Sequence, residues 1–265
     1  MTTEPRTAWW TWLSEAWHAG GTGGLNWHLH AYQSRQRWQP TVHALADFLN
    51  PVNPQRPHLL LIGASAGWMM PSPWLQRFER IDAYDIDPLA GLWFRARHGT
   101  HLRQHGVQLH YHRQDALADL PGLLAQHPQA CVWFDNLLGQ LRYRLGDTEA
   151  AQARLRQLHH DLRDRPWGSV HDAYSGRVRH NPPPISSALT LSFERTTAGV
   201  QHQQRAYAQG AWAQHLLAAI GAEGEWLDHL TADVLPVHTP GQMIPWAFKP
   251  HHWHWLQAGW VKNEG

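Results

Sequence analysis

The chain has 265 residues, enough for one large α/β domain or two small ones with a full hydrophobic core. Hydrophobic residues make up 43% and charged residues 16%, a composition that excludes a disordered chain. The 22 basic and 21 acidic side chains leave a net charge of +1. We therefore expect no basic surface for nucleic acid or for an acidic membrane.

The cysteine content and the lack of a recognisable targeting signal favour the cytoplasm. The only cysteine, Cys131, cannot form an internal disulfide, which is typical of a reducing environment. Residues 1–5 lack the basic region and apolar stretch that begin a signal peptide. No apolar run approaches the roughly 20 residues that a membrane span needs. The sequence predicts a cytoplasmic protein and does not indicate its oligomeric state.

In chain order, a tryptophan-rich helical region comes first. Residues 1–50 have helical character, and prolines at 51, 54 and 57 then mark a linker. We expect an N-terminal helical cap over 1–50 and a second unit over 51–265. Seventeen tryptophans in the whole chain suit either an ordinary core or an aromatic-walled pocket.

From residue 58 onward, strand and helix patterns alternate, which predicts βαβ units around a parallel sheet. The first strand, 58–62, is a continuous apolar run, as expected for a strand covered on both faces. Further strands are predicted at 81–84, 107–111, 130–134 and 168–172, and near 231–237 and 253–261 around a turn at Pro240-Gly241. Helices are predicted after Ser72, from Asp87 to Gly99, over 148–163 and over 203–220.

Chemistry-bearing residues follow three successive strands. The small-residue loop 63–67 follows the first, Asp85 the second and Asp115 the third. Open α/β sheets bind ligands at these strand ends. Small residues let the backbone approach a ligand closely, and a carboxylate can accept hydrogen bonds from both hydroxyls of a ribose. Asp115 can accept from an adenine amino group.

Residues 59–89 resemble the front half of class I S-adenosylmethionine-dependent methyltransferases. Gly63 and Gly67 match the outer glycines of the first motif of that family, Asp85 its ribose acid, and residues 114–116 its adenine-contacting segment. Residues 135–138 match the segment that faces methyl donor and acceptor. The resemblance covers about 57–261.

The resemblance implies a Rossmann-like α/β fold: a doubly wound, mostly parallel seven-stranded sheet with a C-terminal antiparallel hairpin. It implies S-adenosylmethionine as cofactor and methyl transfer to an unidentified small-molecule acceptor. The chain departs from the family pattern at Leu61, where an acid is usual, and at Ser65, which replaces the middle glycine. These departures affect the contacts to the methionine part of the donor more than those to its ribose.

The cofactor-binding residues implied by the resemblance come from the four strand ends and are Gly63, Ala64, Ser65, Gly67, Asp85, Ile86, Asp115, Ala116, Asp135 and Asn136. A general base is needed only if the acceptor must lose a proton first. The catalytic candidates around the donor are Asp135, His171 and Tyr174.

Two other functions stay open. Residues 63–67 also match G-x-S-x-G, the nucleophile elbow of α/β-hydrolases, with Ser65 as nucleophile. Only about 60 residues precede Ser65, too few for the strands that a hydrolase places before its elbow, and Asp85 and Asp115 would have no role. A non-catalytic binding or scaffold protein of the methyltransferase fold is the other alternative.

Closely spaced histidines raise the question of a metal site. His28 and His30, His110 and His112, and the group His251, His252 and His254 could each supply two ligands. None of these groups has a cysteine or carboxylate at ligand spacing, so the sequence predicts no metal site.

Overall fold

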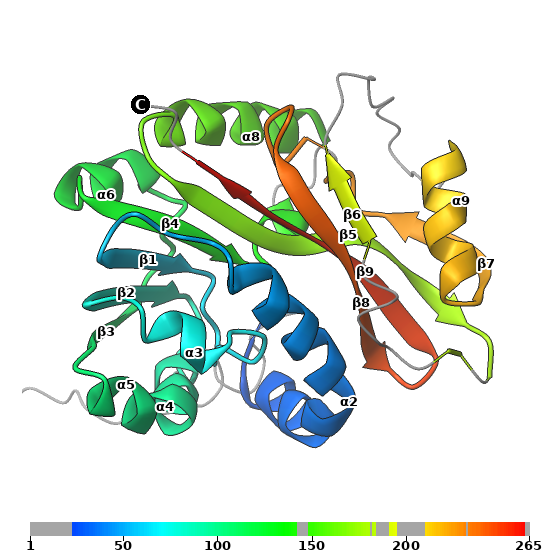
Figure 1. Cartoon of the computed structure of the whole chain (residues 1–265), viewed down its shortest axis with the longest axis horizontal. Helices are drawn as coiled ribbons and strands as arrows, with labels where there is room; N and C mark the ends of the chain where they lie inside the picture. Colours follow the sequence, from blue (N-terminus) through cyan, green and yellow to red (C-terminus); the bar gives the residue numbers. More distant parts are fainter. Residues whose placement is uncertain are drawn as a thin grey trace, which may run out of the picture.

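A nine-stranded sheet forms the centre of the part of the chain that the structure describes (Figure 1). The computed structural model describes residues 23–141, 148–180, 182–183, 191–194, 210–231 and 233–262. The strands are β1 (His58–Ile62), β2 (Arg80–Asp85), β3 (Gln108–Arg113), β4 (Ala130–Asp135), β5 (Trp167–Val178), β6 (Leu191–Glu194), β7 (Ala222–Asp228), β8 (Pro240–Lys249) and β9 (His252–Val261). Their order is β3-β2-β1-β4-β5-β9-β8-β6, and β7 pairs with β5.

The first five strands form a parallel half-sheet in the order 3-2-1-4-5, which is the Rossmann-like order. In the register, Ile62 lies opposite Tyr84 on one side and opposite Phe134 on the other. The residues that follow these three, Gly63, Asp85 and Asp135, therefore come together at one edge of the sheet. The predicted fold class is confirmed, with nine strands where the resemblance implies seven.

The C-terminal strands form the predicted antiparallel hairpin, but its position along the chain differs from the prediction. β9 pairs antiparallel with β5, and β8 with β9. Residues 231–237 are predicted as a strand, but the described residues 233–237 form turns, and Val234 and Leu235 are fully buried in the cluster that holds the leucines of the helix over 148–162. Their apolar character comes from this tertiary contact. The hairpin turn therefore lies at Pro250-His251 rather than at Pro240-Gly241.

The helices are α2 (Leu25–Leu49), α3 (Ser72–Leu75), α4 (Ala90–Phe94), the π-helical turn η1 (Arg95–Gly99), α5 (Thr100–Gln104), α6 (Leu120–Gln126), the 3₁₀ turn η2 (Leu138–Gln140), α8 (Thr148–Leu162) and α9 (Gly210–Ala219). The helix predicted to end at Gly99 continues through η1 into α5. Gly99 has a φ of -61° and a ψ of -36°, which are ordinary helical angles, so it does not terminate the helix. Parts of two predicted helices, 1–22 and 203–209, lie outside the described residues.

Helices cover both faces of the parallel half-sheet, as Figure 1 shows. Leu59 and Leu61 belong to a cluster with residues of α2, α3, α4 and α5, whereas Leu60 and Ile62 pack with α6 and α8. This alternation follows from the two-residue period of a strand. It explains why 58–62 reads as a continuous apolar run. None of the described helices combines the length and apolarity needed to cross a bilayer.

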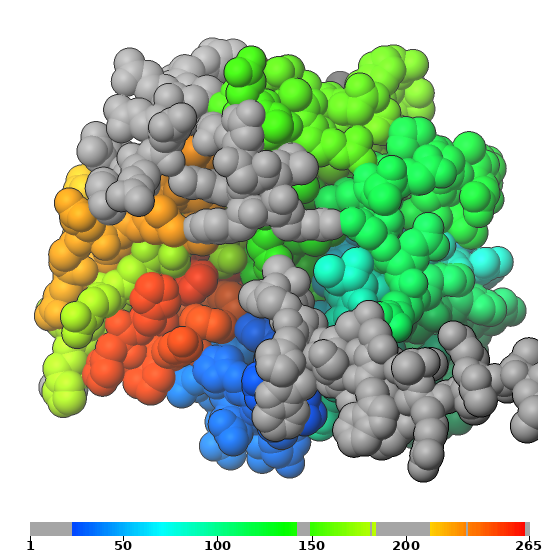
Figure 2. Space-filling view, turned by 180° about the vertical axis from the view of Figure 1, so that it is seen from behind, coloured from blue at the N-terminus to red at the C-terminus, as the bar shows by residue number. Residues whose placement is uncertain are grey.

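Helix α2 packs against the C-terminal strands, and Figure 2 shows it (blue) against the orange-to-red surface of β8 and β9. Beyond Met243 the pairing of β8 with β6 ends, and side chains of α2 bond to carbonyl groups of β8. Thr41 Oγ1 donates to the carbonyl of Pro245 at 2.9 Å, and the buried Trp38 Nε1 donates to that of Phe248 at 3.2 Å. These contacts fix α2 over the edge of the sheet that carries the strand ends.

We expect Gly168→Ala to destabilise the fold by about 1–3 kcal/mol. A Cβ at this position would lie 2.6 Å from ring atoms of both Trp133 and Trp260, two buried and stacked side chains that would have to shift. Gly99→Ala is the matched control, because its Cβ would meet nothing closer than 3.6 Å. That change should be neutral or stabilising by about 0.5–1 kcal/mol. Urea unfolding measures both, and equal stability of the two variants would contradict the packing described.

Candidate functional site

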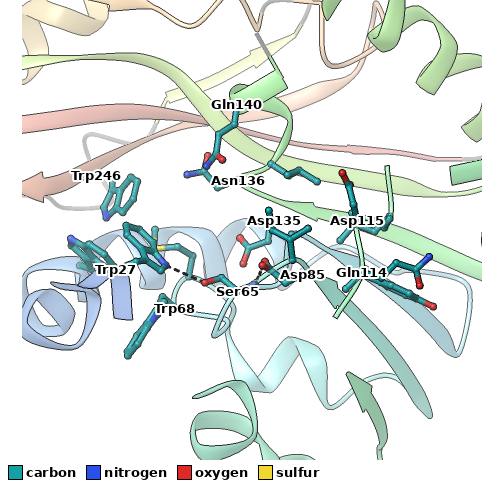
Figure 3. Close-up of a pocket in the computed structure, with 18 residues that line it drawn as sticks. Trp27, Ser65, Trp68, Asp85, Gln114, Asp115, Asp135, Asn136, Gln140 and Trp246 are labelled. Carbon is teal, nitrogen blue, oxygen red and sulfur yellow. Dashed lines mark hydrogen bonds between the residues drawn. The ribbon is translucent and has the colours of Figure 1, made fainter. Parts of the chain in front are cut away.

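A recess opens at the carboxyl ends of β1, β2 and β4 and beside the segment after β3 (Figure 3). It encloses about 920 Å³ including its open mouth. Eight of the ten predicted cofactor-binding residues line it: Gly63, Ser65, Asp85, Ile86, Asp115, Ala116, Asp135 and Asn136. The structure thus brings together residues from four separate strand ends.

The loop 63–67 is held tightly over the end of β2. The backbone N–H groups of Gly63 and Ala64 both donate to the carbonyl of Tyr84, at 2.9 and 3.1 Å. Gly67 has a φ of +61°, and a Cβ there would lie 2.6 Å from His98 Nε2, so only glycine fits. Ala64 and Gly67 do not line the recess. They shape the loop that presents Gly63 and Ser65 to it.

The Asp85 carboxylate ties this loop to the segment after β2. One oxygen accepts a hydrogen bond from Ser65 N and the other from Asp87 N, both at 2.8 Å. Burial raises the pKa of Asp85 to about 6, and the two N–H donors oppose that shift. The group is therefore mainly ionised at pH 7.

Asp135 is the most isolated acid of the recess. Its side chain points toward the same space as Asp85 (Figure 3), and its Oδ1 atom has no hydrogen-bond partner among the described residues. Burial, with a smaller contribution from the Asp85 charge, raises the pKa of Asp135 to about 8. The acid is thus mainly protonated at pH 7. A buried polar atom without a partner is a position that a ligand can satisfy.

The segments that follow β3 and β4 are also pinned by backbone contacts. Gln114 N donates to the carbonyl of Asp85 at 2.9 Å, and Asp115 Oδ1 accepts from Leu117 N at 3.1 Å. Asn136 has a φ of +50°, which asparagine tolerates better than most residues. Its Oδ1 accepts from Asp172 N at 3.1 Å, which joins the end of β4 to β5.

Aromatic side chains form one wall of the recess, and the sequence does not predict which ones. Trp27 and Trp38 of α2, Trp68 after the loop and Trp246 of β8 all line the recess. Trp27 Nε1 donates to Ser65 Oγ at 3.1 Å. The high tryptophan count suits either a core or an aromatic pocket, and nothing in the local sequence distinguishes these four from the other tryptophans.

The start of α2 is anchored beside the recess by Asp87. This carboxylate is 2% exposed, accepts from Gly24 N at 2.5 Å and lies 3.1 Å from His28 Nε2. Interaction with His28 and with backbone N–H groups lowers the pKa of Asp87 against the opposing effect of burial. The contact holds α2 where Trp27 reaches the loop.

Two predicted catalytic residues, His171 and Tyr174, do not line the recess. The sequence predicts that the fifth strand ends at Asp172, whereas β5 continues to Val178, so both residues lie within a strand. His171 is fully buried, and its ring nitrogens bond to Ser169 Oγ and Gln257 Oε1. Burial lowers the pKa of His171 to about 4.

Ser65 has the backbone strain of a nucleophile elbow, with a φ of +43°, but the residues that the structure describes do not give it the base that such a nucleophile needs. The hydrogen bond of its hydroxyl is with the Trp27 indole. An indole N–H is only a donor and cannot accept the proton of a serine. The described geometry therefore does not favour the hydrolase alternative.

No protein-family model and no curated protein matches the chain. Among solved structures it is similar to a SAM-dependent methyltransferase from Anabaena variabilis, at 14% identity over 56% of this chain and 60% of that one, with a TM-score of 0.38. It is also similar to the N-methyltransferase NodS from Bradyrhizobium japonicum in complex with S-adenosyl-l-homocysteine, at 10% identity over 87% and 98% of the two chains, with a TM-score of 0.39. The glycopeptide N-methyltransferase MtfA complexed with S-adenosylmethionine matches at 13% identity over 84% and 94%, with a TM-score of 0.37. The match spans less than two thirds of the Anabaena protein. All three TM-scores are below 0.5, so the case for a function rests on the residues of this chain.

We expect Asp135→Asn to remove a pH dependence of stability. The pKa of Asp135 rises from 3.8 to about 8 on folding, so the folded protein binds the extra proton between about pH 4 and pH 8. The associated stability is fully present below pH 4 and is lost as pH rises through 8. Compared with wild type, the variant should gain at least about 1 kcal/mol between pH 5 and pH 8, as measured by urea unfolding. Parallel pH profiles for the two proteins would contradict the assigned protonation.

Proposed function

We propose that this chain binds S-adenosylmethionine in the recess and transfers its methyl group to a small-molecule acceptor. The observation that carries the proposal is the convergence of the loop 63–67, Asp85 and Asp115 on one recess at the carboxyl edge of the sheet. This is the arrangement expected for a nucleoside ligand in an open α/β sheet. The proposal extends the confirmed fold to an activity.

The adenosyl part would be held by residues of three strand ends. Asp85 would accept hydrogen bonds from the ribose hydroxyls, because its carboxylate is mainly ionised and each oxygen already bonded to an N–H keeps a further lone pair. Ile86, 47% exposed, offers an apolar surface for the adenine ring, with Asp115 and Ala116 beside it. Contacts from the loop 63–67 and from Asn136 complete the proposed binding set.

The methionine part of the donor is cationic, and two features of the recess suit a cation. The carboxyl group of Asp135 has an unpartnered oxygen, and a nearby positive charge would favour its ionised form. Tryptophan faces attract cations through the ring quadrupole, and four tryptophans line the recess. The absence of an acid at Leu61 is consistent with Asp135 supplying the negative charge instead.

S-adenosylmethionine supplies an electrophilic methyl group, so the protein has to position the acceptor in line and exclude water. The aromatic wall of α2 and β8 would exclude water and bind an apolar or aromatic acceptor. Asp135 is the one residue of the predicted catalytic set that lines the recess. In the ionised form that the bound cation favours, it would accept a proton where the acceptor must lose one. We place His171 and Tyr174 outside the reaction, in the packing around β5.

The proposed cap over 1–50 is part of this site through its described segment. Trp27 and Trp38 form the wall, and the contact of His28 with Asp87 holds the start of α2 beside the loop. We propose that the unit over 51–265 supplies the sheet and the nucleoside-binding edge. A non-catalytic protein of the same fold would bind the same nucleoside without forming a demethylated product.

Binding of S-adenosylhomocysteine should weaken by on the order of a hundredfold or more in Asp85→Ala. The change removes two hydrogen bonds to a charged group, each worth about 1.5–3 kcal/mol. Isothermal titration of the full chain measures the loss, and release of S-adenosylhomocysteine from S-adenosylmethionine with a panel of small aromatic acceptors tests turnover.

Asp119→Ala is the matched control for this experiment. Asp119 caps α6 through a 3.0 Å bond from Gly122 N and does not line the recess. Its loss should lower stability by about 1 kcal/mol without changing the affinity. Unchanged affinity in Asp85→Ala, or no binding by wild type at millimolar ligand, would overturn the proposal. Binding without turnover would favour the non-catalytic alternative.

A further inference from the structure

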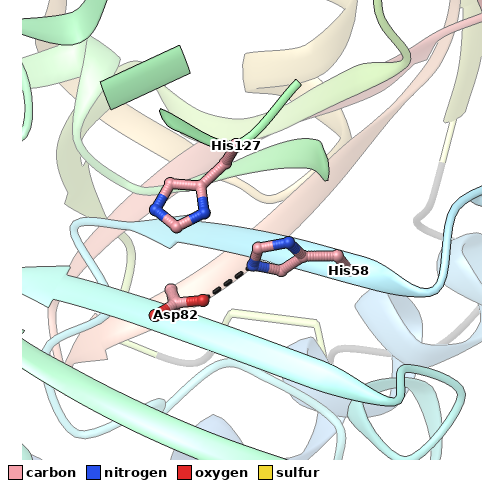
Figure 4. Close-up of side chains that lie close together, drawn as sticks. All are labelled: His58, Asp82 and His127. Carbon is pink, nitrogen blue, oxygen red and sulfur yellow. Dashed lines mark hydrogen bonds and ion pairs between the residues drawn. The ribbon is translucent and has the colours of Figure 1, made fainter. Parts of the chain in front are cut away.

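A group of side chains of the types that can ligate a metal ion lies at the opposite end of β1 from the recess (Figure 4). It consists of His58 at the start of β1, Asp82 within β2 and His127 after α6, and we call it the His–Asp cluster. One ligand atom from each residue lies within 4.8 Å of the others. These residues are far apart in the sequence and meet only through the pairing of β1 with β2 and with β4.

Two members of the cluster are already in contact and largely removed from solvent. The side chain of Asp82 is 1% exposed and that of His58 is 16% exposed. His58 Nε2 lies 2.7 Å from Asp82 Oδ2, a hydrogen bond in which one proton occupies the space between two ligand atoms. A metal ion that binds here would replace that proton.

His127 has a different position in the cluster. Its ring packs edge-on against His58, with centroids 5.0 Å apart and an interplanar angle of 88°. In the part of the chain that the structure describes, its ring nitrogens make no hydrogen bond, although they lie within reach of the other two ligands. A role limited to hydrogen bonding around Asp82 would therefore not need His127.

We propose that the His–Asp cluster binds a divalent transition-metal ion of the Zn²⁺ class. His58 Nε2, Asp82 Oδ2 and one ring nitrogen of His127 would be its protein ligands, with water completing a tetrahedral site. Two imidazoles and one carboxylate form a set of nitrogen and oxygen ligands that suits zinc and its neighbours better than Mg²⁺ or Ca²⁺. The site is independent of the proposed methyltransferase activity.

The same carboxylate also has two basic neighbours on β2 and β3. Arg80 Nε lies 2.6 Å from Asp82 Oδ2, and His112 Nε2 lies 2.9 Å from Asp82 Oδ1. The Arg80 side chain is 44% exposed and can move outward, where solvent screens its charge. In the metal-bound form His112 and Arg80 would bond to Oδ1 and orient the carboxylate, as outer ligands of metal sites do. Arg80 therefore competes with the metal for Oδ2, and removal of its positive charge should strengthen metal binding.

The test is titration of the full-length chain with Zn²⁺ alone, together with visible absorption of the Co²⁺ form, whose d–d bands report tetrahedral coordination. Wild type should show one tight site, and His127→Ala should weaken it roughly a hundredfold or more, since a direct ligand is lost. Arg80→Gln should tighten it, because a competing cation is removed. Zn²⁺ should also raise the melting temperature of wild type more than that of His127→Ala.

His105→Ala is the matched control for adventitious binding to surface histidines. His101 and His105 lie one turn apart on and just after α5, with ring centroids 4.4 Å apart, and form a competing surface pair. Their weak binding should disappear in this variant while the tight site persists. Equal Zn²⁺ affinity of wild type and His127→Ala, a tight site lost in His105→Ala, or weaker binding in folded Arg80→Gln would each overturn the proposal.

Discussion

The half-buried carboxylate of Asp85 is the constraint on which the recess depends. It lies between the loop after β1 and the segment after β2 and accepts one backbone N–H from each. Without it, the N–H groups of Ser65 and Asp87 would lose their partner, at a cost comparable to that of a lost hydrogen bond for each. The parallel register supports the same junction, because it places the carbonyl of Tyr84 where Gly63 and Ala64 can both reach it.

Two acids in the same recess differ in protonation because they differ in partners. Asp85 and Asp135 are both largely removed from water, which raises the pKa of each. Two backbone N–H groups stabilise the ionised form of Asp85, whereas Asp135 has an oxygen without a partner and faces the charge of its neighbour. The result is one mainly ionised and one mainly neutral carboxyl group at neutral pH. A single site can thereby accept hydrogen bonds from hydroxyls and still respond to a positive ligand.

Strands β1 and β2 carry polar groups at both ends, and the two ends differ in their surroundings. At the carboxyl end, α2 and the C-terminal hairpin cover the loops with tryptophans, and the space between them stays open. At the amino end, Asp82 is surrounded by basic side chains of β1, β2 and β3. The sheet thus separates an aromatic recess suited to an organic ligand from a compact imidazole–carboxylate cluster suited to an ion.

Local features can be predicted from the amino-acid sequence: the strand at 58–62, the glycine-bounded loop after it and the acids at the strand ends. Eight of the ten predicted binding positions, three of them acids, line one recess. Strand alternation and turn chemistry act within a few residues, so they can be read from the chain. Other features arise from the folding of distant segments together. These are the choice of tryptophans that line the recess, the continuation of β5 past His171 and Tyr174, the burial of Val234 and Leu235 in turns, and the meeting of His58, Asp82 and His127. Each of these depends on strand register or on packing between distant segments, and neither leaves a periodic mark in the sequence.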